Sequence, residues 1–102
     1  MFWYKKLYLG NTAINLTKRQ IKSIQHGHFF DGVYLVLVSD REGELLEIYN
    51  AFKYPYKRLK KTKRTVVGIA LGYDEALLLV KTIVDDVYKN TGDLDLKTYL
   101  TR

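Results

Sequence analysis

The chain has 102 residues and a formal net charge of +6, and 47% of its residues are hydrophobic and 27% charged. This composition is that of an ordinary globular domain, so it excludes a disordered or fibrous protein and indicates a single domain over residues 1–102. Cysteine is absent, which excludes disulfides, thiolate metal sites and cysteine nucleophiles.

The apolar segments are short. The longest, residues 32–38 and 66–72, fall far below the ~20 residues that a membrane-spanning helix needs. The N-terminus places the aromatic residues 2–4 before Lys5 and Lys6 and has no apolar core segment, so it lacks the pattern of a secretory signal. We therefore expect a cytoplasmic protein without a membrane span.

The first 31 residues predict one strand and one short helix. Residues 3–9 are rich in strand formers and partly alternating, which indicates an edge or half-exposed strand. An antiparallel hairpin over residues 4–16 is an alternative. Thr17 and Gln20 have the spacing of a capping box, so a short helix should begin there and end at Gly27.

The middle of the chain predicts a buried strand followed by a helix. Residues 32–38 form a continuous apolar run, as expected of a strand that is covered on both faces. Ser39 and Glu42 form a second capping-box pattern, which predicts a helix over residues 40–54. Pro55 cannot lie inside that helix, so a bend, a new helical turn or a loop follows. The apolar face of the predicted helix consists of Leu45, Ile48, Tyr49 and Phe52.

The last third predicts another strand, a long helix and a tail. Residues 65–71 form a third apolar run, and Asp74 can cap a helix that Asn90 and Gly92 end. The tail alternates leucines with polar residues, so it adds a short edge strand or lies over an apolar surface. Its leucines are Leu94, Leu96 and Leu100.

The resulting order is β-α-β-α-β-α. It predicts a small two-layer or three-layer α/β domain with a mainly parallel three-stranded sheet, extended by an extra edge strand if the tail pairs with it. Two segments, Met1-Phe-Trp-Tyr-Lys-Lys-Leu-Tyr8 and Val67-Gly-Ile-Ala-Leu-Gly-Tyr-Asp-Glu-Ala76, resemble a group of small uncharacterised bacterial α/β proteins with no assigned function. The resemblance implies a small stand-alone α/β domain and no activity, ligand or catalytic residue.

A parallel sheet would bring three turns to one edge. Ligands of open α/β sheets bind outside the carboxyl ends of the strands, so this edge is a candidate site for a phosphate-type ligand or an unrecognised enzyme activity. The turn at Gly72 lacks repeated glycines and places Asp74 and Glu75 where a phosphate would bind, which favours Asp74 as a plain N-cap. The edge residues are Gly10, Asn11, Ser39, Asp40, Gly72 and Tyr73.

Other chemistry is sparse. His26 and His28 flank Gly27 near Asp31 but lack further strong ligands, so we expect no metal and assign His26 to the carbonyl end of its helix. The sequence has no nucleophile motif, and Asp85-Asp86 fit a solvated helix surface. We expect no catalytic residue and no cofactor.

The net charge is local to one segment. Residues 53–64 contain seven basic residues and no acid, whereas the rest of the chain has ten basic and eleven acidic residues. Cations interleaved with tyrosines suit a nucleic acid, an acidic protein or a membrane surface, and a plain solvated loop is the alternative. The candidate anion-binding residues are Lys57, Arg58, Lys60, Lys61, Lys63 and Arg64, with Tyr54 and Tyr56 as stacking groups or as rings packed on the core.

These observations favour a non-enzymatic binding domain. We also expect a homodimer, because a small sheet leaves its edges uncovered and an aromatic N-terminus can supply an apolar patch. The alternative is that these N-terminal rings complete the core of the monomer. The rings are Phe2, Trp3, Tyr4 and Tyr8.

Overall fold

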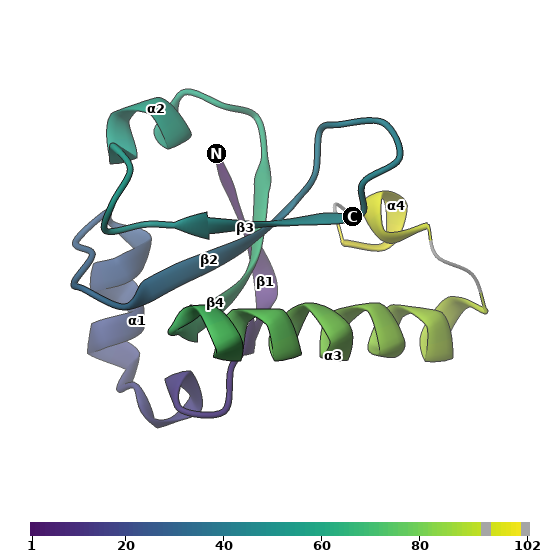
Figure 1. Ribbon diagram of the computed structural model, residues 1–102, viewed down its shortest axis with the longest axis horizontal. Helices are drawn as coiled ribbons and strands as arrows, with labels where there is room; N and C mark the ends of the chain where they lie inside the picture. The colour runs from purple at the N-terminus through teal and green to yellow at the C-terminus, as the bar shows by residue number, and fades with distance from the viewer. Residues whose placement is uncertain (93–94, 101–102) are drawn as a thin grey trace.

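The computed structural model describes residues 1–92 and 95–100 and contains a four-stranded mixed sheet with helices on both faces (Figure 1). The strands lie in the order β1-β4-β2-β3. Strand β1 pairs with β4 in parallel, whereas β2 is antiparallel to both β4 and β3. The prediction of a mainly parallel three-stranded sheet is therefore wrong. The strands are β1 (Phe2–Leu9), β2 (Val33–Val38), β3 (Leu46–Asn50) and β4 (Thr65–Leu71).

Two hydrophobic cores lie on opposite faces of this sheet. The first contains Val36, Val67 and Ile83 and is covered by α3 (Tyr73–Thr91) and α4 (Leu96–Leu100). The second contains Leu35, Ile24 and Leu59. It is covered by η1 (Ala13–Asn15), α1 (Lys18–Gln25) and α2 (Tyr56–Lys60). In the described part of the chain, no helix is long and apolar enough to cross a membrane.

The largest error concerns residues 40–54, which form no helix. Ser39 does not cap one: its hydroxyl accepts a hydrogen bond from the amide of Arg41 (3.1 Å) and donates one to Glu44 (3.2 Å), which closes a turn. Gly43 has φ +87°, a conformation that glycine adopts readily. The chain then returns as β3 along β2, with Val36 opposite Ile48. This added antiparallel strand makes the sheet mixed.

Several local predictions are confirmed. The capping box of α1 forms, with Gln20 N bonded to Thr17 Oγ1 (3.1 Å) and Thr17 N to Gln20 Oε1 (2.8 Å), and Gly27 follows the helix with φ +90°. Pro55 precedes the new helical turn α2. Helix α3 begins at Tyr73 with Gly72 as its N-cap, so the prediction that Asp74 caps it is wrong.

The two ends of the chain complete the cores. Residues 4–16 form no antiparallel hairpin, because β1 pairs with β4 in parallel and η1 follows it. Tyr4 and Tyr8 pack on one core and Trp3 on the other, whereas Phe2 is 59% exposed. In the tail, α4 buries two leucines in the first core, and Leu94 lies outside the described residues. The buried leucines are Leu96 and Leu100.

Candidate anion-binding face

The six predicted edge residues do not converge. Gly10 follows β1 and Gly72 follows β4, and the parallel pairing places both at one end of the sheet, where Gly10 N donates to Ile69 O (2.9 Å). Ser39 follows β2, which runs the other way, so Ser39 and Asp40 lie at the opposite end. Asn11 and Tyr73 directly follow Gly10 and Gly72 and lie at the same end of the sheet as these glycines. The expectation of a shared edge failed because it required parallel strands.

A carboxylate of the protein itself occupies the end near Gly10. Glu75 accepts hydrogen bonds from the amides of Leu71 (2.8 Å), Thr12 (2.9 Å) and Ala13 (3.3 Å) and from the Thr12 hydroxyl. Burial alone would raise the pKa of Glu75, but these hydrogen bonds outweigh it and hold the pKa below its usual value. The amides that would bind a phosphate are thus already occupied.

The opposite end is acidic. A hollow of about 380 Å³ is lined by Ser39 and Arg41 together with four carboxylates. This charge disfavours an anionic ligand. Within residues 1–92 and 95–100, no group of three or more His, Cys, Asp or Glu residues could hold a metal ion. The four carboxylates belong to Asp40, Glu42, Glu44 and Asp95.

The structure also shows the surroundings of two polar residues considered in the sequence analysis, His26 and Asp86. His26 is the C-cap of α1, and its Nδ1 lies 2.7 Å from Lys22 O, which confirms its place at the carbonyl end of the helix. Asp86 is not simply solvated, because its carboxylate accepts a hydrogen bond from the Tyr8 hydroxyl (2.5 Å). Burial and this hydrogen bond raise the pKa of Tyr8.

The basic segment, residues 53–64, forms the end of the turn before α2, α2 itself and the turn after it. Leu59 is 2% exposed and anchors the helix to the second core, which leaves the neighbouring cations on the surface. In the part of the chain that the structure describes, the ion pairs are Arg41–Glu44 and Arg64–Glu47, so the other cations of the segment are free of carboxylates. These exposed cations are Lys53, Lys57, Arg58, Lys60, Lys61 and Lys63.

Three of the predicted contact residues differ in their surroundings. Arg64 is half-buried, and its guanidinium donates hydrogen bonds to Glu47 and to the carbonyl of Val38. Its side chain therefore links strands of the sheet and is not available to a ligand as the exposed cations are. The Tyr56 ring packs edge-on against Phe29, with ring centres 5.3 Å apart. Tyr54 is 48% exposed and lies beside Lys53, whose Nζ is 5.6 Å from the ring centre. Tyr54 is thus the better placed stacking group.

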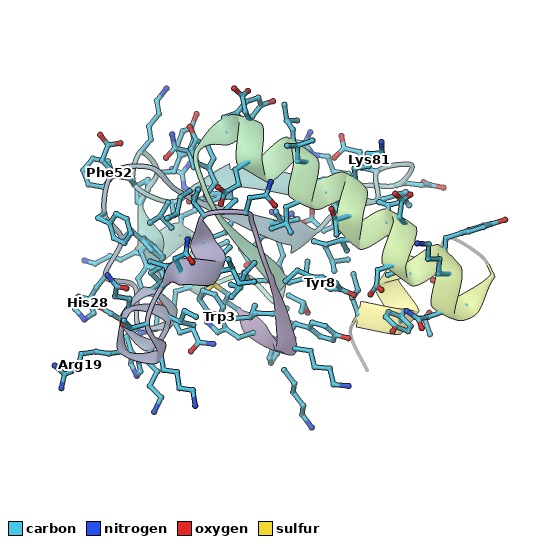
Figure 2. The ribbon with its side chains drawn as sticks, turned by 90° about the horizontal axis from the view of Figure 1, so that it is seen from below. Trp3, Tyr8, Arg19, His28, Phe52 and Lys81 are labelled. Atoms are coloured by element: carbon cyan, nitrogen blue, oxygen red, sulfur yellow. The ribbon has the colours of Figure 1, made fainter. Side chains whose placement is uncertain are left out.

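The fold adds α1 to this surface. Ile24 of α1 and Leu59 of α2 share the second core, and Gly27 lies so close to the Tyr56 ring that a Cβ there would be 2.4 Å from it. Each of the two helices carries three cations and no acid. Figure 2 shows Arg19 of α1 and Lys81 of α3 pointing to opposite sides of the molecule. The cations that α1 adds are Lys18, Arg19 and Lys22, all exposed.

We call this surface the basic face: the exposed cations of α1, α2 and the turn after α2. The run from 53 to 64 could be identified from sequence, but the contribution of α1 could not, because it depends on both helices covering the same side of the sheet (Figure 1). Helix α3 on the other side carries four acidic residues and two lysines. The molecule is therefore polarised, with an excess of positive charge on the side of α1 and α2.

No protein-family model, curated protein or solved structure shows significant similarity to the chain.

Proposed function

We propose that the protein is a binding domain that holds single-stranded nucleic acid on its basic face. The observation that carries the proposal is the convergence of α1 and α2, two acid-free helices far apart in the chain, on one side of the sheet. Lysine and arginine side chains neutralise phosphates and release counterions, which supplies most of the affinity in non-specific binding.

Tyr54 favours a single strand over a duplex. Its ring is about half exposed and lies beside Lys53, and α2 with its cations begins two residues further along the chain. An unpaired base can therefore stack on the ring while the neighbouring lysines contact the phosphates. The Tyr49 ring packs at a tilt against it, with ring centres 5.7 Å apart. The proposed location is the cytoplasm, where such strands are available.

The proposal is tested by titrating a labelled single-stranded oligonucleotide at several salt concentrations. We expect binding near ~50 mM salt that weakens steeply, with a log–log slope of about −0.7 for each phosphate contacted. Reversing two charges with Lys60→Glu and Lys61→Glu should weaken binding equally for all base sequences, because phosphate contacts do not distinguish bases.

The matched control reverses the same number of charges on α3. Lys81→Glu and Lys89→Glu change the net charge equally but lie on α3, which covers the other face of the sheet, so most of the affinity should persist. Equal loss in both double variants would show that only net charge matters and would contradict a defined basic face. Binding of polyglutamate without any binding of the oligonucleotide would assign the face to an acidic protein instead.

A further inference from the structure

Among the residues that the structure describes, no strand pairs with the outer edge of β3. Ser39 N donates to Leu45 O (3.1 Å) and Ala51 N donates to Val33 O (3.1 Å), so the odd-numbered residues of this stretch bond to β2. Because an antiparallel ladder alternates, the backbone groups of the even-numbered residues between them point away from the sheet. Of these groups, the carbonyl of Asn50 accepts from Tyr54 N (3.2 Å). The outward residues are Leu46, Ile48 and Asn50.

The two edges of the sheet differ in their protection. The other edge strand, β1, carries exposed Lys5 and Lys6 and has a break in register between Trp3 and Tyr8, features that discourage pairing. Strand β3 has a regular ladder of five pairs and no proline. Its one charged residue, Glu47, bonds to Arg64. The edge of β3 is therefore the one suited to pairing.

The charges at the two ends of β3 indicate which partner fits its outer edge. The hairpin before β3 exposes several carboxylates, whereas the turn after it exposes Lys53. We propose that β3 pairs antiparallel with β3 of a second copy of this chain, with Ile48 opposite Ile48 across a two-fold axis. Each acidic hairpin then lies beside Lys53 of the other copy, so opposite charges meet at both ends. The carboxylates of the hairpin are Asp40, Glu42 and Glu44.

The pairing also covers apolar surface. Leu46 and Ile48 pack on the first core, on the side of the sheet where α3 lies. On the same side, Leu77 is 47% exposed one helical turn beyond Tyr73, whose ring packs on Tyr34 of β2 with ring centres 6.0 Å apart. The antiparallel dimer continues the sheet, so both copies keep their basic faces on the same side. The inference does not depend on the proposed function.

The first experiment measures mass and amide exchange as the protein concentration rises. We expect the mass to rise from 12.0 kDa towards twice that value, and the amides of Leu46 and Ile48 to exchange more slowly only where the dimer is present. A mass that stays at 12.0 kDa up to the solubility limit would overturn the proposal. A dimer in which these two amides exchange as fast as in the monomer would overturn it too.

The second experiment exchanges the charges at the ends of β3. Glu44→Lys or Lys53→Glu alone places like charges together twice in each dimer, so each should raise the dissociation constant by about tenfold. The double variant restores opposite charges and should recover the wild-type constant. Both residues are exposed, but Glu44 also contacts Ser39 and Arg41 within its own turn, so each variant is compared only where its circular dichroism matches that of the wild type.

The matched control is Lys6→Glu, a charge reversal on the opposite edge strand, which should leave the dissociation constant unchanged. Ile48→Pro removes an outward amide and should abolish the dimer in a variant whose circular dichroism shows a folded chain. No recovery in the Glu44/Lys53 double variant, or equal weakening by Lys6→Glu, would overturn the proposed pairing.

Discussion

At the scale of single residues, Glu75 joins three parts of the chain. Its carboxylate accepts hydrogen bonds from β4 at Leu71 and from the loop before η1 at Thr12 and Ala13. Removing the side chain leaves three amides without this acceptor, two of them in part-buried hydrogen bonds, and hydrogen bonds to a charged group contribute more than neutral ones. We expect Glu75→Ala to lower the free energy of unfolding by about 3 kcal/mol, measured by denaturant titration at neutral pH.

The same carboxylate makes stability depend on pH. Because the pKa of Glu75 is lowered in the folded protein, its contribution is present above the pKa of the unfolded chain, about 4.3, and is lost as pH falls through the folded value. The difference in unfolding free energy between wild type and Glu75→Gln should therefore be constant near neutral pH and shrink in acid. A difference that stayed the same at the lowest pH would contradict the role of the charge.

Gly10 is the residue that makes room for this carboxylate. A Cβ at Gly10 would lie 2.3 Å from Glu75 Oε2, and the carboxylate cannot move aside without losing its hydrogen bonds. We expect Gly10→Ala to destabilise the protein, and to add little further loss in a chain that already carries Glu75→Ala. Full additivity of the two losses in denaturant titrations would show that the residues are independent.

At the scale of elements, Gly68 sets how closely α3 packs on the sheet. A Cβ there would lie 2.9 Å from Leu79 Cδ2 and 3.3 Å from the carbonyl oxygen of Tyr8, and backbone cannot yield as a side chain can. We expect Gly68→Ala to cost about 2 kcal/mol of stability through overpacking. Leu79→Ala opens space on the helix side, so the double variant should lose less than the sum of the single losses.

Local sequence patterns predicted an element correctly where the pattern is compatible with only one type of secondary structure. The apolar runs at 32–38 and 65–71 became β2 and β4, and the capping box at Thr17 began α1. The pattern around Ile48 fits two structures. Leu46 and Ile48 alternate with Glu47 and Tyr49, as in a strand, and the apolar residues also recur at a helical period, namely Leu45, Ile48, Tyr49 and Phe52. Tertiary pairing with β2 decided between them, and that pairing is not visible in a local window.

At the scale of the whole molecule, the same limit applies to the candidate site. The charge of residues 53–64 could be predicted from sequence alone, including most of its exposed cations. The Arg64 side chain points away from the basic face because it pairs with Glu47, and the Tyr56 ring is packed because it contacts Phe29. Each partner is distant in sequence, so neither contact could be predicted from the segment itself. Ser39 lies far from Gly10 because β2 runs antiparallel to β4. The wrong prediction for the direction of one strand therefore made the whole predicted edge site wrong.

If the basic face acts as one surface, the cations of α1 should contribute to binding as those of α2 do. Arg19→Gln and Lys22→Gln together remove two exposed charges without touching the capping box of α1. We expect the log–log salt slope for a single-stranded oligonucleotide to become less steep by about 1.4, the share of two phosphates. Lys81→Gln with Lys89→Gln, the equal change on α3, should leave the slope as in wild type. A slope unaltered by the α1 variant, in a chain whose circular dichroism shows the native fold, would confine binding to α2 and its following turn.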